Sequence, residues 1–129
     1  MVNKVILIGN LGADPEVRYT GKGTPVCNFK LATNEVWYDS AGEKHKKVDW
    51  HRCTAWGRLA EVCGDYLHKG DTIYVEGRLS YGSYNDSNGT TIYYSYVHVV
   101  EMKFVKVKTN VEPEFEVPKG GTDEDDAPF

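Results

Sequence analysis

The stretch VDWHRCTAWGRLAEVCGDYL, residues 48–67, changes its periodicity halfway along. Up to Trp56 the residues include the β-branched and aromatic types that are typical of a β-strand. Beyond Gly57 the apolar residues recur at i, i+3, i+4 and i+7, the spacing of one helix face; they are Leu59, Val62, Cys63 and Tyr66. The stretch therefore predicts a strand that is followed at once by a short helix.

Strand-like segments lie on both sides of this pair. Runs rich in β-branched and aromatic residues occur at 4–11, 26–38, 72–84 and 90–100, with a candidate short sixth strand at 102–107. Turn-forming residues separate the runs at 19–25, 39–42, 69–71 and 85–89. Five strands with one helix between the third and the fourth predict an all-β OB-fold, a five-stranded Greek-key barrel.

The formal net charge of -4 is unevenly distributed along the chain. Residues 112–129 contain seven acids and one base, whereas residues 1–111 contain 14 bases and 12 acids. Regular periodicity also fails from about residue 108, where prolines, glycines and acids predominate. We therefore expect a folded OB domain at 1–107, and a disordered linker with an acidic tail at 108–129.

The cellular compartment follows from the cysteines and from the hydropathy pattern. Three cysteines without a CxxC pair indicate reduced thiols rather than a disulfide framework. No run reaches the roughly 18 apolar residues that a membrane helix needs. The N-terminus has the pattern of a strand rather than that of a secretory signal peptide. We expect a cytoplasmic protein with no membrane partner.

The strand at 48–56 carries the residues that point to a function. Alternation places four side chains on one face, namely Trp50, Arg52, Thr54 and Trp56. Nucleobases stack on aromatic rings with little sequence preference, and an arginine between the rings can pair with phosphate. The alternative is structural: one indole fills the barrel and the other covers its mouth. The strand alone does not decide between these interpretations.

Aromatic residues at the ends of other strands favour the nucleic-acid interpretation. Trp37 and Tyr38 end the second predicted strand, while Tyr81 and Tyr84 lie where the fourth runs into its hairpin. Three further tyrosines leave the assignment open, because consecutive residues face opposite sides of a strand; they are Tyr93, Tyr94 and Tyr96. The basic residues are scattered, and only 44–47 form a run, which indicates a solvated loop that could follow a phosphate backbone.

Enzymatic interpretations find little support in the sequence. His51, Cys53 and Cys63 match no standard set of metal ligands, so we expect no metal and no cofactor. The fragment GNLG is neither a dinucleotide fingerprint nor a P-loop; a bulge at Gly9 and a turn at Gly12 explain it better. A metal-dependent nuclease is the remaining enzymatic hypothesis, and no motif favours it.

Several stretches taken together resemble the bacterial-type single-stranded DNA-binding protein family. They are VNKVILIGNLGADPEVRYT at 2–20, LAT at 31–33, WHR at 50–52, GRLAEVCGDYLHKGDTIYVEGRL at 57–79, and the ending DDAPF at 125–129. The resemblance covers about 2–107 and the extreme C-terminus. It implies an OB-fold, usually as a homotetramer, that binds single-stranded DNA without sequence specificity.

The resemblance also implies which residues bind. The family's stacking positions fall on Trp37, Trp50, Trp56 and Tyr84, and its contacts to the DNA backbone fall on Lys4, Arg18, Arg52, Arg58 and Lys69. His51 matches a position associated with the subunit interface. The partner-binding tail would comprise Asp123, Glu124, Asp125, Asp126, Ala127, Pro128 and Phe129. Its terminal ring would enter an apolar pocket of a replication, recombination or repair protein while the acids steer toward basic residues.

Some features depart from the family. Residues 79–84, LSYGSY, lack the basic residues that relatives often carry there, and Ala127 stands where relatives commonly have isoleucine. The origin is open between a bacterium, with a nucleoid-associated protein, and a phage, with a protein of the host cytoplasm. The main alternative function is an OB-fold adaptor that binds protein or RNA and for which DNA is secondary.

Overall fold

The computed structural model describes residues 1–106, so the predicted linker and acidic tail at 108–129 lie outside the described part of the chain. The described residues form strands and one helix in the following order: β1 (Val5–Leu11), β2 (Glu16–Tyr19), β3 (Pro25–Tyr38), β4 (Lys44–Trp56), α1 (Arg58–Tyr66), β5 (Thr72–Asn85) and β6 (Thr91–Lys106). Of the helices in residues 1–106, none has the length and apolar character needed to cross a membrane.

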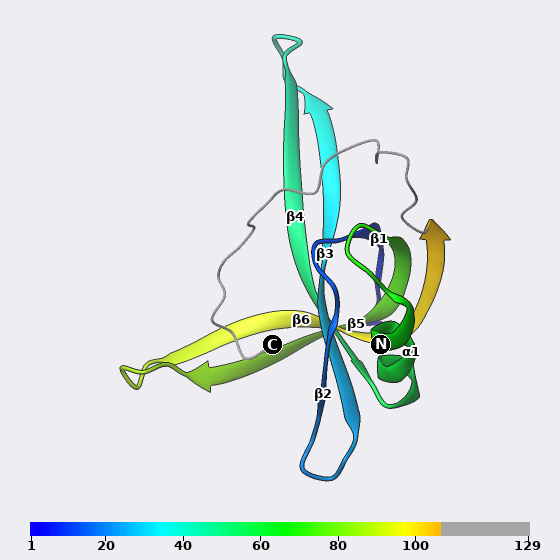
Figure 1. Ribbon diagram of the computed structural model, residues 1–129. Helices are drawn as coiled ribbons and strands as arrows, with labels where there is room; N and C mark the ends of the chain where they lie inside the picture. The colour runs from blue at the N-terminus through cyan, green and yellow to red at the C-terminus, as the bar shows by residue number, and fades with distance from the viewer. Residues whose placement is uncertain (107–129) are drawn as a thin grey trace.

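The strands close into a barrel, in the order β1-β5-β6-β4-β3-β2 (Figure 1). β1 pairs with β5 along Val5–Asn10 and then meets β3 at Asn10 and Leu11. β2 continues the pairing with β3, so β1 and β2 are two halves of one barrel strand. β4 and β6 close the other side as a short parallel pair. The predicted five-stranded OB-fold, with its helix between the third and fourth barrel strands, is confirmed.

Three boundaries differ from the predictions. β2 was not predicted, since the sequence analysis expected no strand between the strand at 4–11 and the turn at 19–25. Four residues pair with β3 there. β4 begins at Lys44 rather than at Val48, since the basic run at 44–47 continues the antiparallel ladder with β3. The candidate sixth strand at 102–107 is the end of β6, which passes an irregularity in its pairing with β5 between Glu76 and Gly77.

The bulge predicted at Gly9 is wrong, whereas Gly12, where a turn was predicted, lies in a bend just after β1. Gly9 pairs with Ile73 in regular register, and its lack of a side chain lets β1 pass against the backbone of Ala32. Gly12 follows the end of β1 and lies under the indole of Trp50. Close approach between segments therefore explains both glycines better than the conformation of the backbone does.

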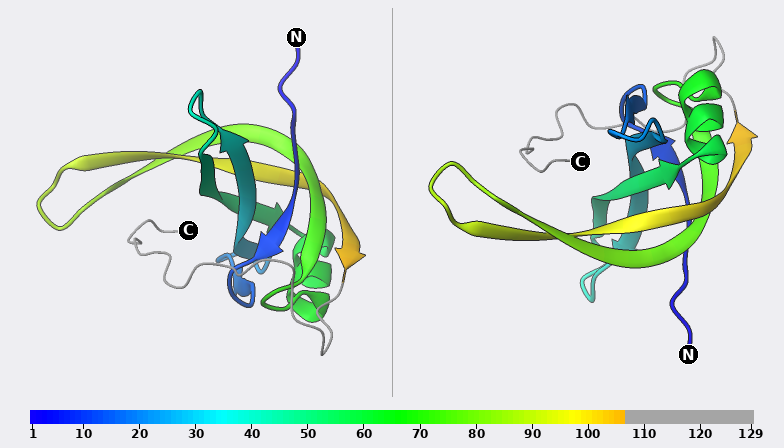
Figure 2. Two further views of the ribbon diagram at one scale, coloured as in Figure 1. Left: turned by 90° about the horizontal axis from the view of Figure 1, so that it is seen from above. Right: turned by 90° about the horizontal axis from the view of Figure 1, so that it is seen from below.

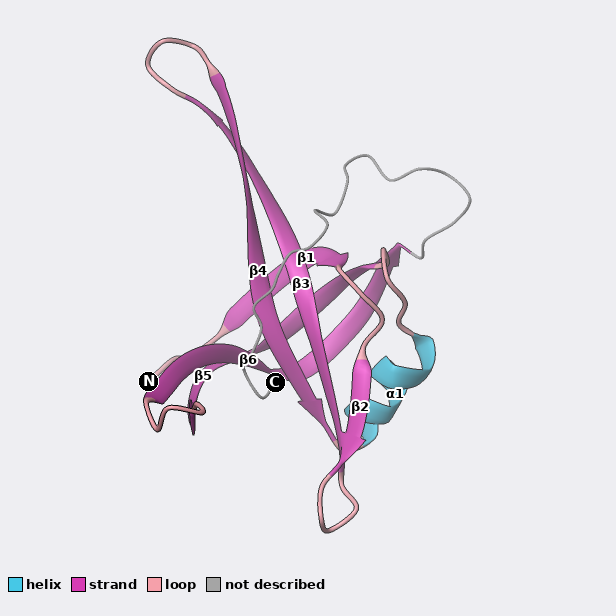
Figure 3. Cartoon of the chain, turned by 60° about the vertical axis from the view of Figure 1, so that its left-hand side comes forward, coloured by secondary structure: helices cyan, strands magenta, loops and turns pink. Residues whose placement is uncertain are grey.

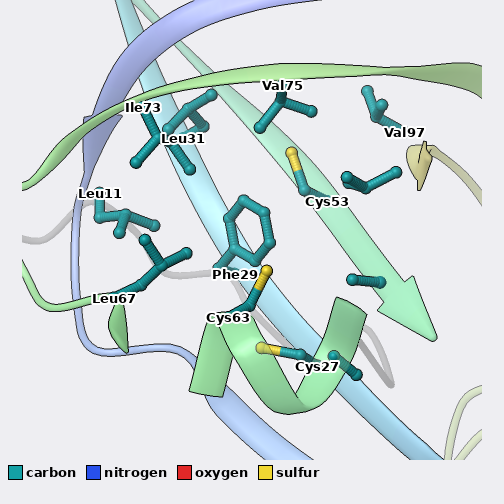
Figure 4. Packing of buried hydrophobic residues seen from close by; sticks show 13 residues of the cluster. Leu11, Cys27, Phe29, Leu31, Cys53, Cys63, Leu67, Ile73, Val75 and Val97 are labelled. Atoms are coloured by element: carbon teal, nitrogen blue, oxygen red, sulfur yellow. The ribbon is translucent and has the colours of Figure 1, made fainter. Parts of the chain in front are cut away.

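The core fills the closed part of the barrel and is capped by α1 (Figure 4). Phe29 lies at its centre among aliphatic side chains, and all three cysteines are buried there as free thiols, as predicted. The helix presents Ala60 and Cys63 to the core. Tyr66, which was expected on this face, is instead exposed, and Leu67 just beyond the helix is buried in its place.

Two long hairpins extend from the barrel in different directions, β3–β4 and β5–β6 (Figures 1 and 2). Their strands continue for several residues past the core, so both faces of each hairpin have little covering them (Figure 3). Their turns share one geometry. In each, an aspartate side chain accepts backbone N–H groups, Asp39 in the first and Asp86 in the second, and a glycine with positive φ follows.

Candidate nucleic-acid interface

Successive side chains of strand β4 point alternately into the core and away from it, as predicted. Cys53 and Ala55 point into the core and are fully buried. The residues between and beside them therefore face outward, away from the core. These outward residues are Trp50, Arg52, Thr54 and Trp56, as predicted, but Thr54 is itself buried and its hydroxyl donates to Asn28 Oδ1.

The two indoles on this face differ in how far neighbouring residues bury them. Trp50 is half-buried and lies against Gly12, where an added Cβ would come within 2.7 Å of the ring atom Cη2. Trp56 ends β4 and is 44% exposed. One ring is therefore seated with a fixed orientation, and the other is open to solvent at the end of the strand. Neither ring fills the barrel. The structural alternative, in which one indole does so, is therefore wrong on that point.

Basic residues flank these indoles in cross-strand rows. Arg18 on β2 lies opposite Val26 on β3, which in turn lies opposite Trp56. Four residue pairs further along the same ladder, Lys30 on β3 lies opposite Arg52. An extended strand placed across this face would meet rings and cations in alternation, which is the combination that single-stranded nucleic acid requires.

The outward face continues from β4 onto β6 and β5. Thr54 pairs with His98, and His98 pairs with Arg78 on β5. Burial, and then the positive charge of Arg78, hold the pKa of His98 below its ordinary value. His98 is therefore neutral at pH 7, and the charge in this row belongs to Arg78.

Tyrosines extend the same face along the β5–β6 hairpin. The guanidinium of Arg52 lies over the ring of Tyr94, 5.7 Å from its centroid. Tyr94 contacts Tyr84 and Tyr96, with ring centroids 6.1 and 5.9 Å away. The predicted stacking residue Tyr84 is thus connected to Arg52 through Tyr94.

Trp37 lies apart from the other predicted stacking residues. It pairs with His45 and has the parity of the core residues Leu31 and Phe29, so it faces the opposite side of the β3–β4 hairpin from Trp50. The His45 ring stacks on its indole, with 5.4 Å between centroids and 20° between planes. The other ring face remains the one available to a base, since Trp37 is 43% exposed.

His45 is itself held by the turn of that hairpin. Its Nε2 lies 2.8 Å from Asp39 Oδ2, while Oδ1 of Asp39 accepts the backbone N–H groups of Ala41 and Glu43. The bond from His45, followed by that from the Glu43 backbone, holds the pKa of Asp39 below its ordinary value. The polar atoms of Asp39, Glu43 and His45 lie within 4.8 Å of one another, a grouping that the sequence analysis missed.

The remaining predicted backbone contacts are more dispersed. Lys4 pairs with Glu76 at 3.2 Å, Arg18 with Glu16, and Arg58 with Glu61 at 3.5 Å. The backbone N–H of Lys69 donates to Asp14 in the loop between β1 and β2. These are surface pairs of small energy, which phosphate can replace at little cost. The structure groups Arg18 and Arg52 with the indoles, and places Arg58 on the helix and Lys69 just beyond it.

The set considered for a metal does not form a site. Cys53 and Cys63 are buried in the core, and burial raises the pKa of the Cys53 thiol. His51 Nε2 instead lies 2.8 Å from the hydroxyl of Thr33, at a half-buried position. Burial lowers the pKa of His51, so this side chain is neutral at pH 7.

Four residues on the outward face were not among the predicted binding residues: Lys30, Arg78, Tyr94 and Tyr96. Lys30 and Arg78 were counted only among scattered bases. Alternation could not place them on this face, because that needs the register that joins one strand to the next.

The chain is similar to known proteins over most of its length. Residues 2–105 match the Single-strand binding protein family. A solved Plasmodium falciparum SSB in complex with ssDNA is similar, with a TM-score of 0.78 and 29% identity over 82% of this chain and 97% of that one. A deletion mutant of the single-stranded DNA binding protein from Thermus aquaticus gives a TM-score of 0.73 and 33% identity over 81% of this chain and 51% of that one.

The resemblance in the sequence, the closed barrel and the match over most of the length agree on one assignment. The chain belongs to the single-strand binding protein family, whose members are non-catalytic DNA-binding proteins.

Proposed function

We propose that this protein binds single-stranded DNA without sequence preference and protects exposed strands. One observation carries the proposal: on the outward face the row of Lys30 and Arg52 lies between Trp50 and Trp56, and Arg18 lies in the row of Trp56. Membership of the family and the ssDNA complex of the Plasmodium falciparum relative support it.

Binding on this face needs no covalent step. Bases stack on Trp50, Trp56 and Tyr84, and every base offers a π-face, so stacking distinguishes poorly between sequences. Arg52 lies between the two indoles along β4 and meets the phosphate that joins stacked nucleotides. Each phosphate contact releases counterions, so affinity should fall as salt rises.

Titration with oligo(dT) while following tryptophan fluorescence tests this proposal. We expect quenching, salt-sensitive affinity and weaker binding to duplex. Replacing Trp50 or Trp56 by Ala should cost about 1–3 kcal/mol each, whereas Phe at either position should retain much of the affinity. Binding to duplex that equals or exceeds binding to single strands would refute the proposal and favour the adaptor alternative.

We propose further that the acidic tail recruits replication, recombination and repair proteins. The seven acids of 112–129 and the terminal Phe129 support this, since an aromatic anchor flanked by acids suits an apolar pocket with a basic rim. The full chain should retain such proteins from a bacterial lysate, and a chain lacking only Phe129 should not. Equal retention by both would contradict a role for the ring.

The same acids are proposed to compete with DNA for the basic outward face. Deleting residues 122–129 should then tighten binding to oligo(dT) at low salt, and the difference should disappear at high salt. Equal affinity of the two chains at low salt would contradict this proposal.

Finally, we propose a cytoplasmic homotetramer. The buried, reduced cysteines support the location. Ile6 and Ile8 support the assembly, because they are 54% and 57% exposed on β1. Within residues 1–106, pairing of β1 with β3 begins only at Asn10, and Gly9 already packs on Ala32, which leaves the edge at Val5–Ile8 for another chain. Sedimentation should give a tetramer, and Ile8→Glu should give smaller species; an unchanged tetramer would exclude this edge.

A further inference from the structure

The β5–β6 hairpin has two chemically different faces beyond the barrel. Alternation places Tyr84, Tyr94 and Tyr96 on the outward face that it shares with Arg52. Tyr81 and Tyr93 lie on the opposite face, where they are 74% and 79% exposed. The outward tyrosines are half-buried by contact with one another, whereas the opposite pair stands in solvent.

Gly82 makes room for the central ring of the outward face. It lies directly opposite Tyr94 in the ladder, and a Cβ there would come within 2.6 Å of both Cζ and Oη of that ring. Tyr94 can therefore lie down across β5 instead of standing away from the sheet. A ring in this position is half-buried, and it has Tyr84 and Tyr96 at its two sides.

We propose that Tyr94 and Tyr96 bind nucleobases and, together with Tyr84, form a stacking platform that extends the DNA path from β4 onto the β5–β6 hairpin. The proposal rests on the single-stranded DNA binding proposed above. Arg52 makes the connection, because its guanidinium belongs to the β4 face and also lies over the ring of Tyr94. Guanidinium planes and tyrosine rings both accept stacked bases.

The composition of the hairpin favours bases over phosphates as its ligand. Between Leu79 and Tyr96 the described chain contains no lysine or arginine, so this segment cannot contribute a cationic phosphate contact. Binding there should therefore release few counterions. A stacking platform adds affinity that persists at high salt, unlike the affinity contributed by Arg18, Lys30 and Arg52.

Full-length variants and fluorescence anisotropy with labelled oligo(dT) test the proposal. Tyr94→Leu and Tyr96→Leu remove the ring but keep a bulky side chain, and each should weaken binding roughly 5- to 150-fold. Tyr94→Phe and Tyr96→Phe keep the ring and should bind as the wild type does. The plot of log affinity against log salt should have the same slope in all four variants, because no phosphate contact is lost.

Tyr81→Leu and Tyr93→Leu are the matched controls, since they make the same change on the opposite face of the same hairpin. Their affinity should equal that of the wild type, and urea unfolding should show all variants folded. Wild-type affinity in the Tyr94→Leu and Tyr96→Leu variants would overturn the proposal, as would equal losses in the controls. A slope that becomes shallower by about 0.7 in Tyr94→Leu would also overturn it, because the ring would then only position Arg52.

The outcome for the wild type separates this proposal from the function on which it rests. A wild-type chain that fails to bind oligo(dT) refutes the proposed function. A wild-type chain that binds, while the tyrosine variants bind equally well, refutes the platform alone.

Discussion

Replacing Gly12 by Ala should unseat Trp50 and weaken DNA binding although position 12 need not touch DNA. A Cβ at this position would lie 2.7 Å from Cη2 of the indole and closer still to Cζ3. Carbon atoms in contact are separated by about 3.5–4.0 Å, so the ring must move outward by roughly 1 Å. The φ of Gly12 is not positive, so the substitution strains packing rather than the backbone.

Two energies follow from this displacement. Forcing a methyl group into an occupied space typically costs about 1–3 kcal/mol of stability. Losing the orientation of one stacking ring should cost up to about 1–3 kcal/mol of binding, which is the range for removing the ring. The affinity for oligo(dT) should therefore fall by at least several-fold while the chain remains folded.

Anisotropy titration with oligo(dT) measures the first effect, and a double-mutant cycle identifies its cause. Gly21→Ala is the matched control, because a Cβ at Gly21 meets nothing within 4 Å. In a Trp37→Phe, Trp56→Phe background Trp50 is the single indole, and Gly12→Ala should shift its emission toward that of exposed tryptophan. In a Trp50→Ala background Gly12→Ala should cost no further affinity.

Two results would contradict the proposed contact between Gly12 and Trp50 as the cause. Wild-type affinity and emission in Gly12→Ala would show that the indole has room to move without consequence. An equal loss with and without Trp50 would show that position 12 acts through something other than this ring.

Three further predictions concern stability and thiol reactivity. Because the pKa of Asp39 is lowered in the folded state, its contribution to stability is complete above the ordinary carboxyl pKa and is lost as pH falls through the lowered value. Acidification should therefore destabilise the wild type more than Asp39→Asn. Equal pH dependence of the two chains in urea unfolding would contradict this. Burial raises the pKa of Cys53, so iodoacetamide should label this thiol only after unfolding, and rapid labelling of the native chain would contradict the burial. Phe29→Ala should lower the free energy of unfolding by about 3–5 kcal/mol, measured in urea, with a smaller loss for Phe29→Leu; a loss near zero would contradict its central place in the core.

Alternation and helical spacing were sufficient to predict most of the barrel. Residues 48–67 have their periodicity set by burial on one side, so the change from strand to helix is visible in the residues themselves. The strand at 44–47 was missed because its side chains are all polar, and a hairpin beyond the core has no buried face to impose alternation. Cross-strand contacts such as that of Trp37 with His45 support it instead.

The sequence predicted which side chains share a face within one strand, but not which strands lie side by side to form the binding surface. Trp50, Arg52 and Trp56 share a strand, so period two placed them together. Trp37 was grouped with them by resemblance, although its parity puts it on the other side of the hairpin. The seat of Trp50 on Gly12 and the contact between Arg52 and Tyr94 join segments far apart in the chain, and no local pattern encodes such contacts.

Residues 1–111 are nearly neutral, with 14 bases and 12 acids, but the charges of β3 and β4 are separated by face. On β3 and β4 the outward positions include four bases and no acid, the bases being Lys30, Lys44, Lys46 and Arg52. The acids of these two strands, Glu35 and Asp49, have the opposite parity. A chain with little net charge can therefore present a cationic surface to a polyanion, because period two separates the signs. The base-poor hairpin then does not imply weak binding, since β3 and β4 can supply the phosphate contacts and the tyrosines of β5 and β6 the stacking.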